Sequence, residues 1–212
     1  MRRLIPLLSM VLLFVGCVHC GFSSYPNVRV EYDRVANVNS YADIAISADQ
    51  EVEIRFSTYG GRIVHRHNDR VIWQAPNEPG SYYVDALVIS PSRSELDRMR
   101  IKVVDFVVGV VGAELVDDGA GGKSVRLQVF NAAGKKVTDF RVKLLLTNGS
   151  GERVAYLGDY QLTREVSEAN LAPRSQQSYV VSLQGISGVS NVYAWVYEAA
   201  FEDGTVLNLY EQ

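Results

Sequence analysis

The sequence predicts an all-β fold of two tandem β-sandwiches that follow an N-terminal signal peptide. Apolar and polar residues alternate with period two through most of the chain after residue 27, and no long segment has the 3.6-residue period of an amphipathic helix. Turn pairs such as Asp49-Gln50, Gly60-Gly61 and Asn68-Asp69 separate the short runs, as they do between sandwich strands. Hydrophobic residues make up 47% and charged residues 21%, which indicates a globular chain.

The first residues have the features of an export signal. Arg2 and Arg3 precede an apolar run over residues 4–15, and Gly16 and Cys17 follow it. A helix of about 20 apolar residues is needed to cross a bilayer, so this run is too short for a permanent membrane anchor. We therefore expect cleavage of the signal and an extracytoplasmic location.

Residues 14–17, Phe-Val-Gly-Cys, resemble the lipobox of bacterial lipoproteins. The resemblance implies that residues 1–17 are a lipoprotein-type signal peptide ending at the lipobox cysteine, and that Cys17 carries acyl chains such as palmitate, which anchor a chain to a membrane. Because Val18 rather than Asp follows, the resemblance favours the outer membrane or the cell surface. The alternative is an ordinary secretory signal, cut after Cys17 or Cys20, which would release a soluble protein.

Cysteine use and charge exclude several function classes. Cys17 and Cys20 are the only cysteines of the sequence, and both lie at the processing site, where a redox or metal pair would lack the folded scaffold it needs. The formal net charge is −3, so we expect no nucleic-acid partner. We also expect no cofactor.

The first sandwich is predicted over residues 23–104. Its strands are expected over residues 28–35, 42–48, 51–57, 62–66, 70–76, 81–90 and 99–104. Residues 73–82 read Trp-Gln-Ala-Pro-Asn-Glu-Pro-Gly-Ser-Tyr, a pattern that resembles a segment of bacterial Ig-like and PKD-like extracellular modules. The resemblance implies an Ig-like sandwich in which Trp73 packs into the core and Pro79-Gly80 makes a turn, and it names no ligand.

The second sandwich is predicted over residues 105–212. The continuous apolar run at residues 106–112 joins the modules, so we expect a semi-rigid pair. Strands are expected over residues 123–130, 137–147, 178–183, 191–201 and 205–209, with a polar stretch over 158–172. Residues 131–135, 140–144, 171–173 and 201–205 resemble FxLYD-type and fibronectin-III-like modules of bacterial envelope proteins, and no catalytic residues come with that resemblance.

Tyr193, Trp195 and Tyr197 alternate along one predicted strand and therefore share one face of it. If that face meets water, three rings in a row form a stacking platform for a glycan or a partner protein. If it faces inward, the rings fill the sandwich core, which is the more common place for such side chains. These rings are the candidate ligand-binding residues of the chain.

Other motifs have weaker functional interpretations. His65 and His67 share a strand face, as a metal pair must, and Asp69 or Asp85 could supply a third ligand, but exposed histidines before a turn are ordinary. Asp117-Asp118-Gly119 offers too few oxygens for Ca²⁺. Residues 119–124 match part of the sequence pattern of a phosphate-binding loop. A strand pattern follows them where such a loop requires a helix, so we expect a flexible turn.

Together these observations favour two tandem Ig-like β-sandwiches tethered to the bacterial envelope through Cys17. We expect a non-enzymatic protein-binding or scaffolding lipoprotein whose partner is another envelope protein. The alternative is a carbohydrate-binding surface module that uses Tyr193, Trp195 and Tyr197. A metal-dependent enzyme at His65 and His67 is the third alternative; the expected chain is not an enzyme and has no metal site.

Overall fold

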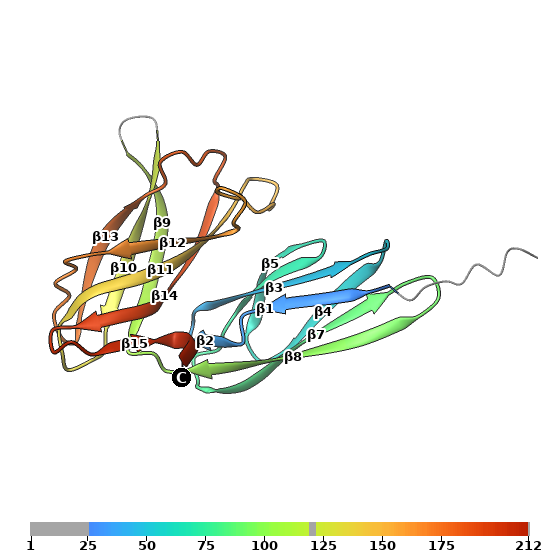
Figure 1. Ribbon diagram of the computed structural model, residues 1–212, viewed down its shortest axis with the longest axis horizontal. Coiled ribbons are helices and arrows are strands. Elements are labelled where there is room, and N and C mark those ends of the chain that lie inside the picture. The colour runs from blue at the N-terminus through green and yellow to red at the C-terminus, as the bar shows by residue number, and fades with distance from the viewer. Residues whose placement is uncertain (1–25, 119–121, 212) are drawn as a thin grey trace, which may run out of the picture.

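The computed structural model describes residues 26–118 and 122–211, which form two β-sandwiches in contact with each other (Figure 1). The predicted all-β sandwich fold is confirmed, because the described residues contain fifteen strands and one 3-10 turn, η1, at Leu209–Glu211. In this part of the chain no helix is long and apolar enough to span a membrane. Cys17 lies outside the described residues, so the signal peptide and the lipid anchor remain predictions.

The N-terminal sandwich consists of two four-stranded sheets. The first has the order β1-β3-β6-β5, with β1 at Val28–Tyr32, β3 at Tyr41–Ala48, β6 at Arg70–Gln74 and β5 at Arg62–His67. The second has the order β2-β8-β7-β4, with β2 at Val35–Asn37, β8 at Ser94–Val104, β7 at Gly80–Ile89 and β4 at Glu53–Tyr59. Neighbouring strands are antiparallel except β2 and β8, which pair in parallel.

Trp73 is fully buried in the core of this sandwich, the place that the Ig-like resemblance implies. Its indole Nε1 donates to Thr58 Oγ1 at 2.9 Å and to the Gly60 carbonyl at 3.0 Å, so its polar atom is satisfied. The turn at Gly60 and Gly61 passes directly over the ring. Gly61 has φ +67°, and a Cβ there would lie 2.4 Å from the Gln74 carbonyl oxygen and 2.6 Å from the indole, so this position requires glycine.

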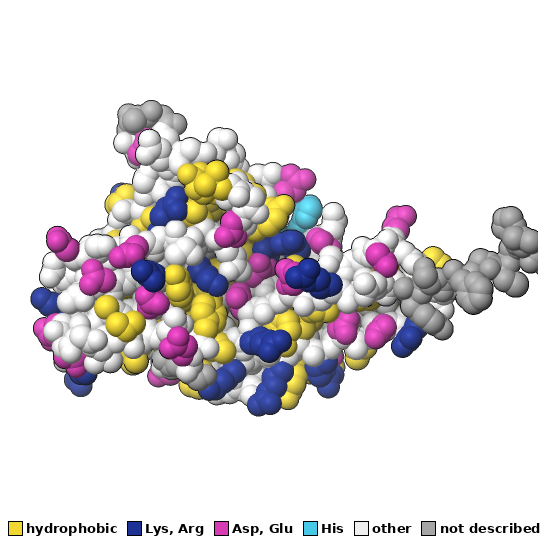
Figure 2. All heavy atoms as spheres, in the orientation of Figure 1, with side chains coloured by type: hydrophobic (Ala, Val, Ile, Leu, Met, Phe, Trp, Pro, Cys, Tyr) yellow, Lys and Arg dark blue, Asp and Glu magenta, His cyan; other side chains and the backbone are white. Residues whose placement is uncertain are grey.

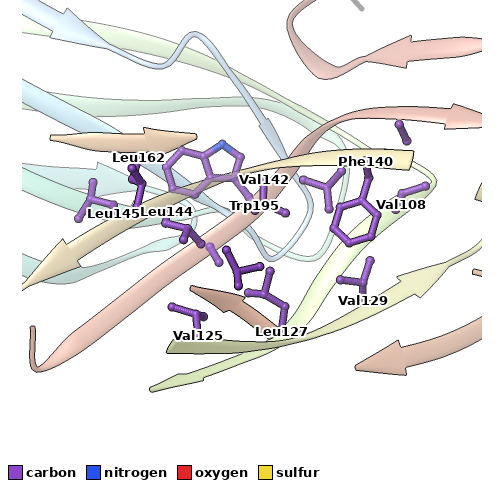
Figure 3. Close-up of a cluster of buried hydrophobic side chains, with 14 of the residues drawn as sticks. Val108, Val125, Leu127, Val129, Phe140, Val142, Leu144, Leu145, Leu162 and Trp195 are labelled. Atoms are coloured by element: carbon purple, nitrogen blue, oxygen red, sulfur yellow. The ribbon is translucent and has the colours of Figure 1, made fainter. Parts of the chain in front are cut away.

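The C-terminal sandwich pairs a three-stranded sheet with a four-stranded one. The three-stranded sheet has the order β13-β10-β9, with β13 at Ser175–Ser182, β10 at Lys123–Asn131 and β9 at Val108–Asp117. The four-stranded sheet has the order β12-β11-β14-β15, with β12 at Gln161–Val166, β11 at Val137–Thr147, β14 at Asn191–Phe201 and β15 at Val206–Asn208. Figure 3 shows part of its core, in which Val125, Leu127 and Val129 of β10 lie beneath Phe140, Val142 and Leu144 of β11.

Four strand predictions need correction. The strand expected over residues 28–35 is two strands, β1 and β2, which belong to different sheets. The apolar run at residues 106–112 is not a linker, because β9 begins inside it at Val108 and the connection from β8 is only residues 105–107. The polar stretch over residues 158–172 contains β12, an edge strand whose outward residues are polar and therefore hid its alternation. The strand expected over residues 99–104 begins earlier, at Ser94.

The two sandwiches meet through the outer faces of two sheets. Tyr193 on β14 pairs in register with Leu145 on β11, and its ring packs edge-on against Tyr41 of β3 with centroids 5.2 Å apart. Leu145 is 0% exposed although it points away from β10, and Ile72 of β6 belongs to the same buried cluster. The sheet β1-β3-β6-β5 therefore covers the outer face of β11 and β14.

Polar contacts fix this junction. Arg153 forms a forked ion pair with Asp43 of β3, and their side chains are only 5% and 11% exposed. Gln161 Nε2 donates to the same carboxylate at 3.3 Å. At the chain crossing, Phe106 N donates to Asn37 Oδ1 at 2.8 Å, and Asn37 Nδ2 donates back to the Phe106 carbonyl. These contacts hold the two sandwiches as a single unit.

Candidate functional site: an open sheet face of arginine and tyrosine

The sheet β2-β8-β7-β4 has one face in the N-terminal core and one open to solvent. Strand alternation sends Phe56, Val84 and Met99 into the core, so their neighbours point outward. We call this outer surface the arginine–tyrosine face; its members are Arg55, Ser57, Tyr59, Ser81, Tyr83, Asp85, Leu87, Leu96, Arg98, Arg100 and Lys102. Tyr59 is 60% exposed and Leu96 is 56% exposed, so the described residues leave this face uncovered.

The register of the three strands sorts the face into rows. Tyr59 lies opposite Tyr83, which lies opposite Arg100. The next row along the strands is Ser57, Asp85 and Arg98, and the one after it is Arg55, Leu87 and Leu96. An aromatic row, an ionic row and an aliphatic row thus lie side by side.

Asp85 and Arg98 form the fixed centre of the face. Arg98 Nε and a terminal nitrogen donate to the two carboxylate oxygens of Asp85, both at 2.8 Å. Asp85 is 3% exposed, and a buried carboxylate needs such a forked partner to offset its lost hydration. The hydrogen bonds from Arg98 lower the pKa of Asp85 below its usual value, so this carboxylate is ionised at neutral pH.

Two tyrosines of the neighbouring row lie close to the Arg98 guanidinium. Its Cζ lies 5.4 Å from the centroid of the Tyr59 ring and 5.6 Å from that of Tyr83. Cation–π contacts of this kind contribute about 0.5–1 kcal/mol at exposed sites. Since Asp85 also holds the guanidinium, Arg98 is fixed in place before any partner arrives.

Positive charge is in excess at one end of the face. Arg55 pairs with Glu53 at 2.6 Å, and Arg98 pairs with Asp85. Arg100 donates only to the neutral Ser81 hydroxyl, at 3.2 and 2.9 Å, and within the described residues neither Arg100 nor Lys102 has a carboxylate at ion-pair distance. Figure 2 shows Lys and Arg side chains gathered along the lower edge of the molecule, over β7 and β8, with hydrophobic side chains between them.

The predicted aromatic row of Tyr193, Trp195 and Tyr197 does not form an open platform. The rings point away from β10, as a surface platform requires, but the N-terminal sandwich and η1 lie over them. Trp195 is 2% exposed, and its Nε1 donates to the Tyr210 hydroxyl at 3.2 Å. The contact between the sandwiches, which no local pattern reveals, uses this face.

His65 and His67 also lie at the junction. They line a cavity of about 300 Å³ together with Asp69, Arg153 and Tyr160. Within residues 26–118 and 122–211, no three His, Cys, Asp or Glu side chains are grouped so that they could hold a metal ion. Asp85, named from sequence as a third ligand, is in the other sheet and bound to Arg98.

The segment around Asp117 and Asp118 connects β9 to β10. Asp117 pairs with Lys123 at 2.7 Å, and Asp118 accepts a hydrogen bond from the Gly122 backbone at 2.8 Å. Residues 119–121 lie outside the described residues. Because β10 follows this segment where a phosphate-binding loop would need a helix, the motif is a strand connection.

Sequence reasoning missed the arginine–tyrosine face, although the sequence contains its signal. Arg98, Arg100 and Lys102 recur at every second position, and Tyr83, Asp85 and Leu87 do the same on the preceding strand. Two adjacent strands with this pattern place a mixed basic and aromatic surface on one side of a sheet. The three aromatic rings of β14 were a more conspicuous pattern, and they are covered.

Comparisons with known proteins add little to this geometry. No family model matches the chain, and no curated protein matches it. A hypothetical protein from Peptoclostridium difficile 630 aligns over 50% of this chain and 87% of its own, with 13% identity and a TM-score of 0.39. The adhesin InvE of Yersinia pseudotuberculosis aligns over 86% of this chain and 58% of its own, with 15% identity and a TM-score of 0.30. TM-scores this low carry no function to this chain.

Proposed function

We propose that this chain is a non-enzymatic binding protein of the bacterial cell envelope, and that it holds a partner protein on the arginine–tyrosine face. The observation that carries the proposal is the exposure of Tyr59 and Leu96 beside an Arg98 side chain that is already fixed by Asp85. Tyrosine and arginine are among the residues that contribute most to protein interfaces. A side chain held in one position before binding loses less conformational entropy on association.

The rest of the molecule supports this role. The buried pair of Arg153 and Asp43 joins the sandwiches, so the face is presented on a stiff body. The expected acylation of Cys17, which rests on the lipobox resemblance, would tether that body to the envelope. The carbohydrate alternative depended on an open row of rings on β14, and that row lies in the junction.

Photo-crosslinking in living cells tests the binding face. A photoreactive phenylalanine analogue in place of Tyr59 should give a discrete crosslinked species, because this ring is 60% exposed on the face. The same analogue in place of Val180, 64% exposed on β13, is the matched control and should give none. Leu96→Asp should remove the Tyr59 species. Equal crosslinking from both positions, or a Tyr59 species that survives Leu96→Asp, would contradict the proposal.

The tether is tested separately by intact mass. Mature protein from the membrane fraction should carry an acyl-sized addition that Cys17→Ala removes. An unmodified chain in the soluble fraction would contradict the envelope tether and leave the binding face untouched.

A further inference from the structure

We infer that the partner surface held by the arginine–tyrosine face is an acidic protein segment that carries at least one apolar side chain. The inference rests on the proposed function and specifies the chemistry of the partner. It follows from how charge and apolar surface are distributed over the rows of the face.

The basic end of the face can accept negative charge from a partner. Arg100 and Lys102 stand two residues apart on β8, both are exposed, and neither has a carboxylate partner within the described residues. Arg98 donates two of its N–H groups to Asp85, and a guanidinium has five, so further donors remain for a second carboxylate. Three cations along one strand can thus each meet an acidic group.

The two leucines of the face favour an apolar contact. Leu96 is 56% exposed and lies opposite the half-buried Leu87, so the pair forms an aliphatic patch next to the row of Asp85 and Arg98. Covering a leucine side chain contributes about 25 cal/mol for each Å² removed from water. An apolar side chain of a protein gains this energy, whereas a polysaccharide chain offers few aliphatic groups.

The charge pattern also argues against an anionic membrane as the occupant. Glu53 lies at the end of the face opposite Lys102, in register with Ile89 where β4 begins. A uniformly negative surface would bring a like charge against Glu53. A protein segment can place its carboxylates over Arg98, Arg100 and Lys102 alone.

Selection of binders from a random peptide library on the full mature chain tests the inference. We expect the enriched peptides to carry several Asp or Glu residues near an apolar residue. The double variant Arg100→Glu/Lys102→Glu should weaken their binding at least about tenfold, the scale of losing a charged contact. The double variant Arg62→Glu/Arg174→Glu makes the same change of net charge elsewhere, at exposed positions, and should change the affinity less than about twofold.

Charge reversal in the peptide sharpens the test. Peptides in which Lys replaces Asp and Glu should bind the Arg100→Glu/Lys102→Glu variant more tightly than the unmodified chain. Peptides that are neutral or basic, yet lose binding with Leu96→Asp, would overturn the acidic partner and leave the proposed function standing. Peptides that are indifferent to Leu96→Asp and to Arg100→Glu/Lys102→Glu would overturn both.

Two further probes test whether a membrane or a polysaccharide binds the face instead of a protein segment. Vesicles of phosphatidylcholine with phosphatidylglycerol, and heparin as an anionic polysaccharide, should bind the chain more weakly than the selected peptides. Tighter binding to either probe that Leu96→Asp abolishes would overturn the assignment to a protein segment.

Discussion

Two sheet faces of this molecule carry similar residues, but one is covered by the other sandwich and the other is exposed. The outer face of β11 and β14 carries Tyr193, Trp195 and Lys143, and the first sandwich covers it. The outer face of β4, β7 and β8 carries Tyr59, Tyr83 and Arg98, and the described residues leave it open. Aromatic residues beside charge therefore do not by themselves identify a binding face. What distinguishes the two is whether another part of the chain already lies on them.

Burial also sets the charge chemistry of each face. At the junction the carboxyl of Asp33 has a raised pKa, mainly because burial penalises its charged form. On the open face the carboxyl of Asp85 has a lowered pKa, mainly because Arg98 donates hydrogen bonds to it. Packing at the junction offsets the cost of burying the Asp33 carboxyl. The ion pair with Asp85 holds Arg98 in one position at the exposed surface.

The largest expected difference in unfolding free energy is between the alanine variants of two aromatic residues, one covered and one exposed. Trp195→Ala should cost about 3–5 kcal/mol of unfolding free energy, because it leaves a cavity between the sandwiches. Tyr59→Ala on the open face should cost less than about 1 kcal/mol, as surface substitutions do. Urea unfolding of both variants measures this, and similar costs would contradict the covered and open assignment.

Breaking the junction ion pair should lower the free energy of unfolding almost as much. Arg153→Ala leaves the Asp43 carboxylate buried without its partner, which costs about 3–5 kcal/mol in known cases. The matched control is Arg141→Ala, which removes exposed pairs with Glu165 and Glu198 and should cost about 0–1 kcal/mol. Thermal or urea unfolding distinguishes them. A cost for Arg153→Ala no larger than that of the control would contradict a tightly closed junction.

Asp85→Asn should destabilise the chain by about 1–3 kcal/mol at neutral pH, since it removes a charge-assisted forked pair. The pKa of Asp85 is lower in the folded state, so its stabilisation is present above the unfolded pKa of about 4 and is lost as pH falls through the folded pKa. The difference between variant and unmodified chain should therefore shrink in acid. A difference that grows toward acid would contradict this assignment.

Asp33→Asn should change the free energy of unfolding least, and in the direction opposite to that of Asp85→Asn. The pKa of Asp33 is higher in the folded state, so its neutral form is favoured below the unfolded pKa of about 4 and that contribution is lost as pH rises through the folded pKa. At pH 7 the variant should be as stable as the unmodified chain or more stable, because asparagine still accepts the Asp43 backbone hydrogen bond. Melting temperatures across pH check this, and a clear loss of stability at pH 7 would contradict it.

The sequence predicted more of the fold than of the candidate site. The Ig-like resemblance implied the core position of Trp73. Alternation and turn pairs located most strands, because both follow from local backbone chemistry. They missed β12, whose outward side chains are polar, and they read the apolar start of β9 as a connection. The sequence left open whether the rings of Tyr193, Trp195 and Tyr197 face water or the core. Alternation along one strand could not show that Tyr41 and Tyr210, from other elements, pack against them.

Hydroxyl-radical footprinting of the chain in the cells that make it tests the central claim most directly. Compared with the purified protein, Tyr59, Tyr83 and Leu96 should be protected from oxidation in the cell, because a partner covers the arginine–tyrosine face. Val180 and Val206, which are exposed elsewhere, should be oxidised equally in both samples. Unchanged oxidation of Tyr59 and Leu96 together with protection of Val180 or Val206 would contradict the account and move the binding face to the C-terminal sandwich.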